Sequence, residues 1–160
     1  MPASPAILIV EDDSFNRETL SYFLTKNNLK VSAVQSGEAA LQAVQDERPH
    51  LILLDIMMPD MDGFETCRRL KANSKTQNIP VIFITALSDT VDKIKGFELG
   101  AVDFITKPFQ QQEVLARIKT HLRLSHLQQQ LQARTDELEV NYLELKKKIN
   151  HLRTTVGSKQ

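Results

Sequence analysis

Four short apolar runs in this sequence each lead into polar side chains that could do chemistry together. In chain order these side chains are Glu11, Asp12 and Asp13, then Asp55, then Thr85, and finally Lys107. Carboxylates that share one site repel each other at neutral pH unless a cation lies between them. Oxygen ligands on a partly open site suit Mg²⁺, which keeps several waters and accepts a phosphate oxygen. A lysine and a hydroxyl beside such an ion could orient a transferring phosphoryl group, with Asp55 as the oxygen nucleophile.

These apolar runs must then be strands whose carboxyl ends meet at one edge of a sheet. Leu51–Leu54 is a run of four aliphatic residues, which predicts a strand buried on both faces, and Pro59 and Gly63 mark the turn after it. Five strands are predicted, at Ala6–Val10, Lys30–Val34, Leu51–Leu54, Val81–Ile84 and Ala101–Ile105. Helices are predicted between successive strands. The apolar side of the fourth helix consists of Val91, Ile94, Phe97 and Leu99.

This alternation predicts an α/β fold, a doubly wound five-stranded parallel sheet with helices on both faces. In the flavodoxin-like strand order 2-1-3-4-5, the first and third strands are neighbours, and the winding switches between them. Asp12 and Asp55 should therefore share one crevice, flanked by Thr85 and Lys107.

Other acidic residues and the histidines are assigned no chemistry. Asp13 is the expected cap of the first helix, and Asp60 and Asp62 are expected turn and cap residues. The histidines are scattered, without metal-ligand spacing or an adjoining acid, and are expected at the surface. They are His50, His121, His126 and His151.

Leucines recur at every seventh position in the C-terminal part of the chain, which predicts a left-handed supercoil. With these leucines at position d of the heptad, the predicted seam is Leu124, Leu131, Leu138, Tyr142, Leu145, Ile149 and Leu152. We expect one helix from about residue 110 to 156 that forms a parallel homodimer through this seam. Arg134 would then face Glu139 of the partner subunit, an attractive pair.

Two other interpretations of this segment are weaker. A single solvated helix is possible because Leu127, Val140 and Leu143 lie off the register. A DNA-binding leucine zipper requires a continuous basic helix before the heptads. Only Arg117, Lys119 and Arg123 lie there, partly on a helix that must cover the sheet.

The composition bounds the cellular setting. The chain has 160 residues with 20 basic and 20 acidic side chains, so its net charge attracts neither nucleic acid nor an anionic membrane. We therefore expect no direct nucleic-acid partner and no membrane association. The single cysteine, Cys67, excludes a disulfide framework, fits a reducing cytosol and is expected to be buried. Without a signal peptide or an apolar stretch of about 18 residues, the protein is expected to be cytoplasmic.

Four stretches together give the sequence a family resemblance. They are Ile-Leu-Ile-Val-Glu-Asp-Asp at 7–13, Leu-Ile-Leu-Leu-Asp-Ile-Met-Met-Pro-Asp-Met-Asp-Gly at 51–63, Ile-Thr-Ala at 84–86, and Gly-Ala-Val-Asp-Phe-Ile-Thr-Lys-Pro-Phe at 100–109. Any one alone is a weak motif, but four in order are specific. Residues 7–122 resemble a bacterial-type response-regulator receiver domain, the phosphoacceptor half of a two-component signalling pair.

The resemblance implies a role for each residue that matches the motif. Asp55 would be the site of phosphorylation. The metal set would be Asp12 and Asp55 directly, Glu11 through water, and the backbone carbonyl of Met57. Thr85 and Lys107 would contact the phosphoryl group. Phe104 would be the switch aromatic that turns inward as Thr85 moves, and the Lys107–Pro108 bond would be cis.

The resemblance also implies partners and a phosphoryl lifetime. The phosphoryl group would come from a phosphohistidine on a sensor histidine kinase or a phosphotransfer protein. Met57 and Leu87 occupy the two positions that most vary the lifetime in the family. Neither can orient an attacking water by hydrogen bonding, so slow self-dephosphorylation is expected. The coiled coil would pass the phosphorylation state to an effector.

Two rival functions remain. An aspartyl phosphatase also uses an aspartate at a strand end with Mg²⁺, but it normally has a second acid where this chain has Met57, so we expect no turnover enzyme. The alternative is a degenerate receiver that serves as a phosphorylation-independent dimerisation scaffold. The intact set of acids, threonine and lysine argues against it.

The expected organisation follows from these assignments. Residues 1–5 are an N-terminal tail and residues 6–122 the receiver domain. Residues 123–156 are the coiled-coil dimerisation helix, and residues 157–160 are a tail or a truncation point.

Overall fold

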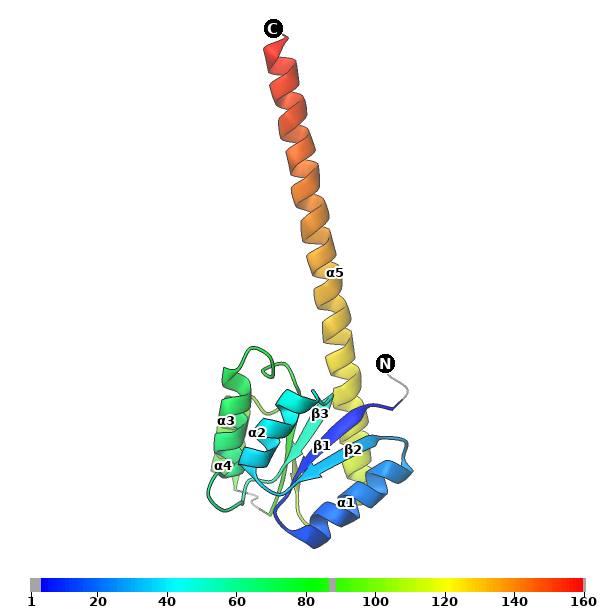
Figure 1. Ribbon diagram of the computed structural model, residues 1–160, viewed down its shortest axis with the longest axis vertical. Coiled ribbons are helices and arrows are strands. Elements are labelled where there is room, and N and C mark those ends of the chain that lie inside the picture. Colours follow the sequence, from blue (N-terminus) through cyan, green and yellow to red (C-terminus); the bar gives the residue numbers. More distant parts are fainter. Residues whose placement is uncertain (1–3, 87–88, 160) are drawn as a thin grey trace. The chain divides into compact units, whose positions relative to one another are not determined.

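A five-stranded parallel sheet forms the centre of the N-terminal part of the chain (Figure 1). The strands are β1 (Ala6–Val10), β2 (Lys30–Val34), β3 (Leu51–Leu54), β4 (Val81–Thr85) and β5 (Asp103–Thr106). They pair in parallel in the order β2-β1-β3-β4-β5, which confirms the predicted topology. Since Val10 of β1 pairs with Leu54 of β3, the residues that follow these strands emerge side by side.

The helices alternate with the strands. They are α1 (Ser14–Lys26), α2 (Gly37–Asp46), α3 (Gly63–Ala72), α4 (Thr90–Glu98) and α5 (Gln111–Ser158). This is a computed structural model that describes residues 4–86 and 89–159. The chain divides into two units, Met1–Ser125 and His126–Gln160.

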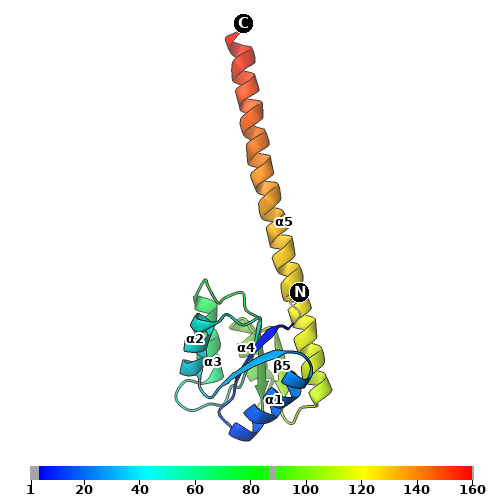
Figure 2. The same ribbon diagram turned by 45° about the vertical axis from the view of Figure 1, so that its right-hand side comes forward.

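Each face of the sheet is covered by its own set of helices, as Figures 1 and 2 show from two directions. On one face the core contains Val44 from α2 and Leu70 from α3. On the other face it contains Leu24 from α1 and Ile118 from α5. All four residues of β3 are fully buried between these layers, as a run of four aliphatic residues predicts. The sheet is therefore the rigid support from which the site loops emerge.

The helix ends use local capping residues. The side chains of Asp13, Ser36, Asp62 and Asp89 accept hydrogen bonds from the first turns of α1, α2, α3 and α4. Because an N-cap side chain satisfies an otherwise unpaired backbone N–H, these residues have a structural role there. Gly100, just after α4, has φ of 104°, a left-handed conformation that favours glycine.

Helix α4 differs from its sequence-based description. Val91, Ile94 and Phe97 are 71%, 52% and 47% exposed, so most of the predicted apolar side faces solvent. The buried residue of this helix is Gly96. A Cβ atom on Gly96 would lie 2.5 Å from Cε2 of Phe104, so the missing side chain lets the helix backbone rest on that ring.

Helix α5 changes its environment along its length. Within the first unit, Val114, Ile118 and Leu122 are buried against the sheet. In the second unit, every described side chain from residue 127 to 159 is exposed. Gly157 does not end the helix, which continues to Ser158. Among the residues that the structure describes, no helix combines the length and apolar character needed to cross a membrane.

Candidate functional site

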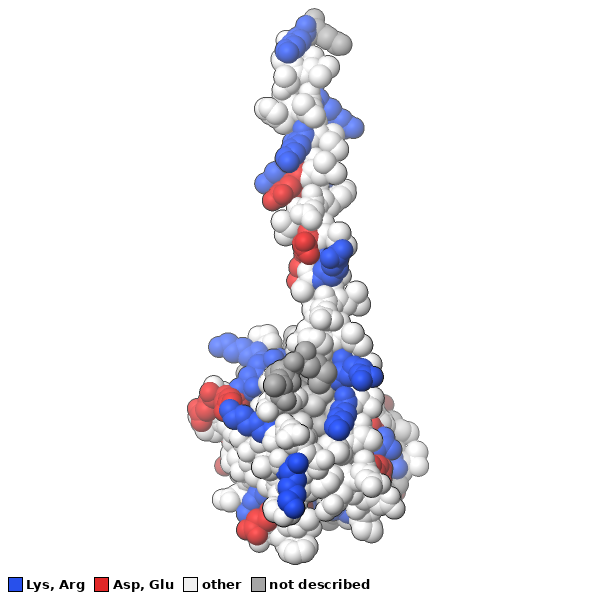
Figure 3. Space-filling model, turned by 90° about the vertical axis from the view of Figure 1, so that its right-hand side faces the viewer, with Lys and Arg blue, Asp and Glu red and all other residues white. Residues whose placement is uncertain are grey.

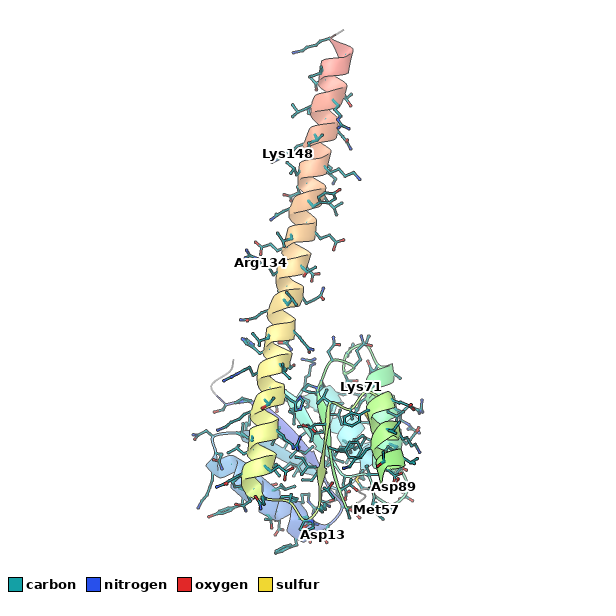
Figure 4. All side chains as sticks on the ribbon, turned by 180° about the vertical axis from the view of Figure 1, so that it is seen from behind. Asp13, Met57, Lys71, Asp89, Arg134 and Lys148 are labelled. Carbon is teal, nitrogen blue, oxygen red and sulfur yellow. The ribbon has the colours of Figure 1, made fainter. Side chains whose placement is uncertain are left out.

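Three carboxylates from the loops after β1 and β3 meet at the carboxyl edge of the sheet. Ligand oxygens of Glu11, Asp12 and Asp55 all lie within 4.8 Å of one another. Glu11 and Asp55 are buried, whereas Asp12 is exposed, so the cluster opens to solvent on one side. In Figure 4, Asp13 and Met57 mark this end of the domain.

Lys107 supplies a cation to the buried side of this cluster. Its Nζ donates to Oε1 of Glu11 at 2.6 Å and to Oδ2 of Asp55 at 3.3 Å. The lysine follows β5, and its backbone N–H donates to the carbonyl of Thr85 at 2.7 Å, which ties it to the end of β4. The Lys107–Pro108 bond is cis, as expected.

The neighbouring charges and burial shift the pKa values of Glu11 and Lys107. Burial and, to a smaller extent, the adjacent Asp55 carboxyl together raise the pKa of Glu11 to about 7, and Lys107 only partly opposes them. Burial alone would lower the pKa of Lys107, but Glu11 and Asp55 outweigh it and raise that pKa above its usual value. Burial and the neighbouring Asp55 carboxyl therefore dominate at Glu11, while Lys107 stays cationic.

The donor set fits a divalent cation that prefers oxygen. All three side chains offer carboxylate oxygens, and the exposed side leaves room for water, which suits Mg²⁺. Oε2 of Glu11 is buried and has no hydrogen-bond partner within residues 4–86 and 89–159. A buried carboxylate oxygen without a partner is costly, and an ion or its water would satisfy it. The residues present therefore fit the expected metal.

The remaining predicted site residues lie around this cluster in different ways. Thr85 ends β4 and is fully buried. The Met57 backbone N–H donates to Oδ1 of Asp55 at 3.3 Å, while its side chain is 58% exposed. Phe104 lies apart, in the core, with its ring centroid 5.1 Å from that of Phe83. Leu87 falls outside the described residues.

Arg17 is a site residue that the sequence analysis missed. Its Nη1 donates to the backbone carbonyls of Glu11 at 2.9 Å and of Asp12 at 3.3 Å. The guanidinium thus holds the acidic loop from the first turns of α1. The available signal was an arginine four residues after the helix cap Asp13, close enough for its side chain to fold back on the loop.

A second polar cluster corrects the assignment of the histidines. His121 was expected at the surface without an acidic neighbour, but its Nε2 lies 2.9 Å from Oδ2 of Asp103, and its side chain is 15% exposed. Arg117 Nη1 donates to both carboxylate oxygens of the same aspartate at 2.9 Å. Separations of 14 and 18 residues carry no local sequence signal. Cys67 is fully buried as expected, and burial raises the pKa of its thiol to about 11.

Comparison with known proteins gives a consistent family. Residues 7–119 match the family described as the response regulator receiver domain. The transcriptional regulatory protein AfsQ1 of Streptomyces coelicolor is 41% identical over 119 residues, which cover 74% of this chain and 52% of that protein. The DNA-binding response regulator MtrA of Mycobacterium tuberculosis is 42% identical over 117 residues, which cover 73% and 50%. The chain thus spans about half the length of these curated relatives.

Solved structures agree with the family match. The activated N-terminal receiver domain of RstA from Klebsiella pneumoniae, a BeF3 form, superposes with a TM-score of 0.69 at 34% identity. That match covers 74% of this chain and 98% of the other. The receiver domain of Francisella response regulator 1452 has a TM-score of 0.72 at 28% identity and covers 76% and 99%.

The expectation of no direct nucleic-acid partner is contradicted. AfsQ1 is named as a transcriptional regulatory protein and MtrA as a DNA-binding response regulator. The expectation rested on the balanced charge and on the lack of a basic helix before the heptads. Those features describe only this chain, which spans about half of these relatives, so they exclude nothing about DNA.

Proposed function

The chain belongs to the response-regulator receiver family, and from that membership we propose that Asp55 accepts a phosphoryl group with Mg²⁺ as cofactor. The donor is a phosphohistidine on a sensor histidine kinase or a phosphotransfer protein. The observation that carries the proposal is the position of Lys107, whose Nζ lies within 3.3 Å of Asp55 beside the three-acid cluster. A phosphoryl acceptor needs this arrangement of a nucleophilic carboxylate, a metal site and a fixed cation.

Each residue then has a defined task. Asp12 and Asp55, the Met57 carbonyl and, through water, Glu11 would hold the ion. When bound, Mg²⁺ supplies positive charge that reduces repulsion between the carboxylates and the phosphoryl oxygens. Asp55 forms the new oxygen–phosphorus bond as the nitrogen–phosphorus bond breaks, and the departing imidazole keeps that bonding pair. Lys107 and the Thr85 hydroxyl orient the transferred group.

The output proceeds through a dimer of the coiled-coil tail, the part of α5 from residue 123 to 156. The five heptad leucines are between 47% and 69% exposed, so a second copy of this chain can cover them. In a parallel pair, Arg134 faces Glu139 of the partner subunit, with opposite charges. This pair favours the parallel arrangement in the middle of the seam.

Phosphorylation changes the tail through the switch residues. The new charge draws Thr85 and Lys107 inward, and Phe104 repacks the surface of α4, β5 and α5. Because α5 continues into the tail, the change rotates or shifts the paired helices where polar Gln128 and Thr135 make the seam weakest. The chain itself is no turnover enzyme. The names of its relatives make transcription a candidate output of the effector. A phosphorylation-independent scaffold would not control that output.

Phosphorylation of Asp55 can be tested with a small phosphodonor. Acetyl phosphate and Mg²⁺ should add the mass of one phosphoryl group to the full chain, and EDTA should prevent it. Asp55→Asn should abolish the mass change. Asp60→Asn is the matched control, since Asp60 lies in the same loop with φ of 65°, a conformation that asparagine tolerates. An unchanged mass of the native chain, or equal labelling of Asp55→Asn, would refute the proposal.

A further inference from the structure

Asp103 gathers two side chains of α5 at the start of the tail. Both of its carboxylate oxygens accept hydrogen bonds from Arg117 Nη1 at 2.9 Å, and Oδ2 lies 2.9 Å from Nε2 of His121. Burial raises the pKa of Asp103, but hydrogen bonds from His121, the Phe104 backbone and Arg117 outweigh it and hold that pKa below its usual value. The carboxylate is therefore charged and fully engaged within its own domain.

The heptad register places the same two side chains on the seam. With the leucines at d, the preceding a position is His121 and the d position before it is Arg117. In a parallel pair, residues at a and d meet their counterparts from the second helix. Arg117 and His121 would therefore be the next two layers of the dimer after Leu124, and both are polar.

The exposed fraction of the side chains at the a and d positions shows where along α5 the seam becomes buried. Leu124 is 47% exposed and Leu131 is 69% exposed. The His121 side chain is 15% exposed, and Val114, the a position before Arg117, is fully buried in its own core. The a and d side chains of α5 are thus exposed at residue 124 and buried in the domain at residue 114. Asp103 contacts the two that lie between these positions.

We propose that the surface covered by a second copy of this chain begins at Leu124, and that Asp103 sets this limit by holding Arg117 and His121 on their own domain. The inference rests on the dimeric tail of the proposed function and adds the residue that delimits it. Without the Asp103 carboxylate, the Arg117 guanidinium group of each chain would be released at the end of the paired helices next to residue 124. Like charges brought together near a partly dry interface repel strongly, so the pair would open from this end.

A double-mutant cycle on the dimer dissociation constant tests this role. Sedimentation equilibrium of the full chain should show that Asp103→Asn raises the constant about tenfold at low salt, an effect of the size seen for coupled residues. In the background Arg117→Gln with His121→Gln, the same substitution should change it less than about twofold. Contacts that only stabilise the folded domain would not show this dependence, because they act equally on monomer and dimer.

Disulfide formation locates the effect along the tail. In a chain with Cys67→Ala, cysteines introduced by Leu124→Cys or Leu152→Cys should each cross-link between copies. At concentrations where both variants are fully dimeric, Asp103→Asn should slow cross-linking at position 124 and leave position 152 unchanged, and the latter also shows that the tail remains intact. Glu113→Gln is the matched control, since it removes a carboxylate 3.2 Å from Arg117 without touching Asp103.

The outcomes separate the two proposals. A native chain that stays monomeric refutes the dimeric output and this inference with it. A dimeric chain in which Asp103→Asn has no effect, or acts equally in both backgrounds or at both cysteine positions, overturns only the role of Asp103.

Discussion

Lys107 is held by two buried acids, unlike the solvent-exposed ion pairs found elsewhere among the described residues. Its side chain is 19% exposed, and Glu11 and Asp55 are 1% and 6% exposed. By contrast, Lys30 and Glu47 form a pair with both side chains 60% exposed. Solvent screens the second pair, whereas removal of the cation from the first leaves buried carboxylates uncompensated. The two lysines should therefore differ in their effect on folding.

We predict that Lys107→Ala lowers the free energy of unfolding by about 2–3 kcal/mol in EDTA at pH 8, because buried acids lose their counter-charge. Lys30→Ala should change it by less than about 0.5 kcal/mol. Urea denaturation of both variants measures the difference. Added Mg²⁺ should recover part of the loss in Lys107→Ala, since an ion that binds only the folded state stabilises it. Equal losses for the two lysines would contradict the buried-cation interpretation.

Strand ends could be predicted at the site, but contacts between distant side chains could not. Asp55 and Lys107 each follow an apolar run, so the alternation of strands and helices already placed them at one edge. Arg17 and His121 act through bonds to a loop carbonyl and to a strand residue. Such bonds depend on which turn of a helix passes which part of the sheet, and helical periodicity specifies only the buried face.

Helix α4 shows how a single glycine can override apolar spacing. The sequence places Val91, Ile94 and Phe97 at helical intervals, which normally indicates the buried side. Burial of Gly96 instead brings the helix backbone onto Phe104, whose ring centroid is 5.5 Å from that of Phe97. The boundaries of most strands followed from apolar runs, whereas the orientation of this helix depended on a residue without a side chain.

We predict that Gly96→Ala destabilises the domain by about 1–3 kcal/mol, as overpacking of a filled core does. The new Cβ would lie 2.5 Å and 2.7 Å from two carbons of the Phe104 ring. Gly157→Ala is the matched control, because nothing lies within 4 Å of a Cβ there and alanine favours a helix. Thermal denaturation should show the loss only for Gly96→Ala.

A Phe104→Leu background tests the stated cause of this loss. A smaller side chain leaves room for the methyl group, so the cost of Gly96→Ala should fall below about 1 kcal/mol. An undiminished cost would assign the effect to the backbone of α4 instead of the Phe104 ring.

The tail carries its charges unevenly along its length. On the face seen in Figure 3, its acidic side chains occur nearer the domain, and only basic ones occur at the far end. After Glu144 the sequence contains no aspartate or glutamate. In a parallel pair, Lys148 would face Arg153 of the partner subunit and repel it. The far end must therefore be held by its apolar residues, and Ile149, Leu152 and Val156 are exposed there.

We predict that Leu138→Ala with Leu145→Ala raises the dimer dissociation constant at least about a hundredfold, because each substitution removes a buried leucine from both chains. Val140→Ala with Leu143→Ala is the control. These side chains are 54% and 50% exposed, against 59% and 58% for the seam leucines, and differ mainly in heptad position. Analytical ultracentrifugation distinguishes the pairs. Equal effects would favour a solvated helix or another register.

The placement of Asp103 also bears on chimeric regulators made by exchanging tails between receivers. A junction placed after Leu124 keeps Asp103 with the arginine and histidine that it binds. A junction between β5 and Arg117 would separate Arg117 and His121 from Asp103, so the recipient strand must supply an equivalent carboxylate even when the heptads are in phase. Modular exchange of these helices is therefore constrained by an acid that lies outside the exchanged segment.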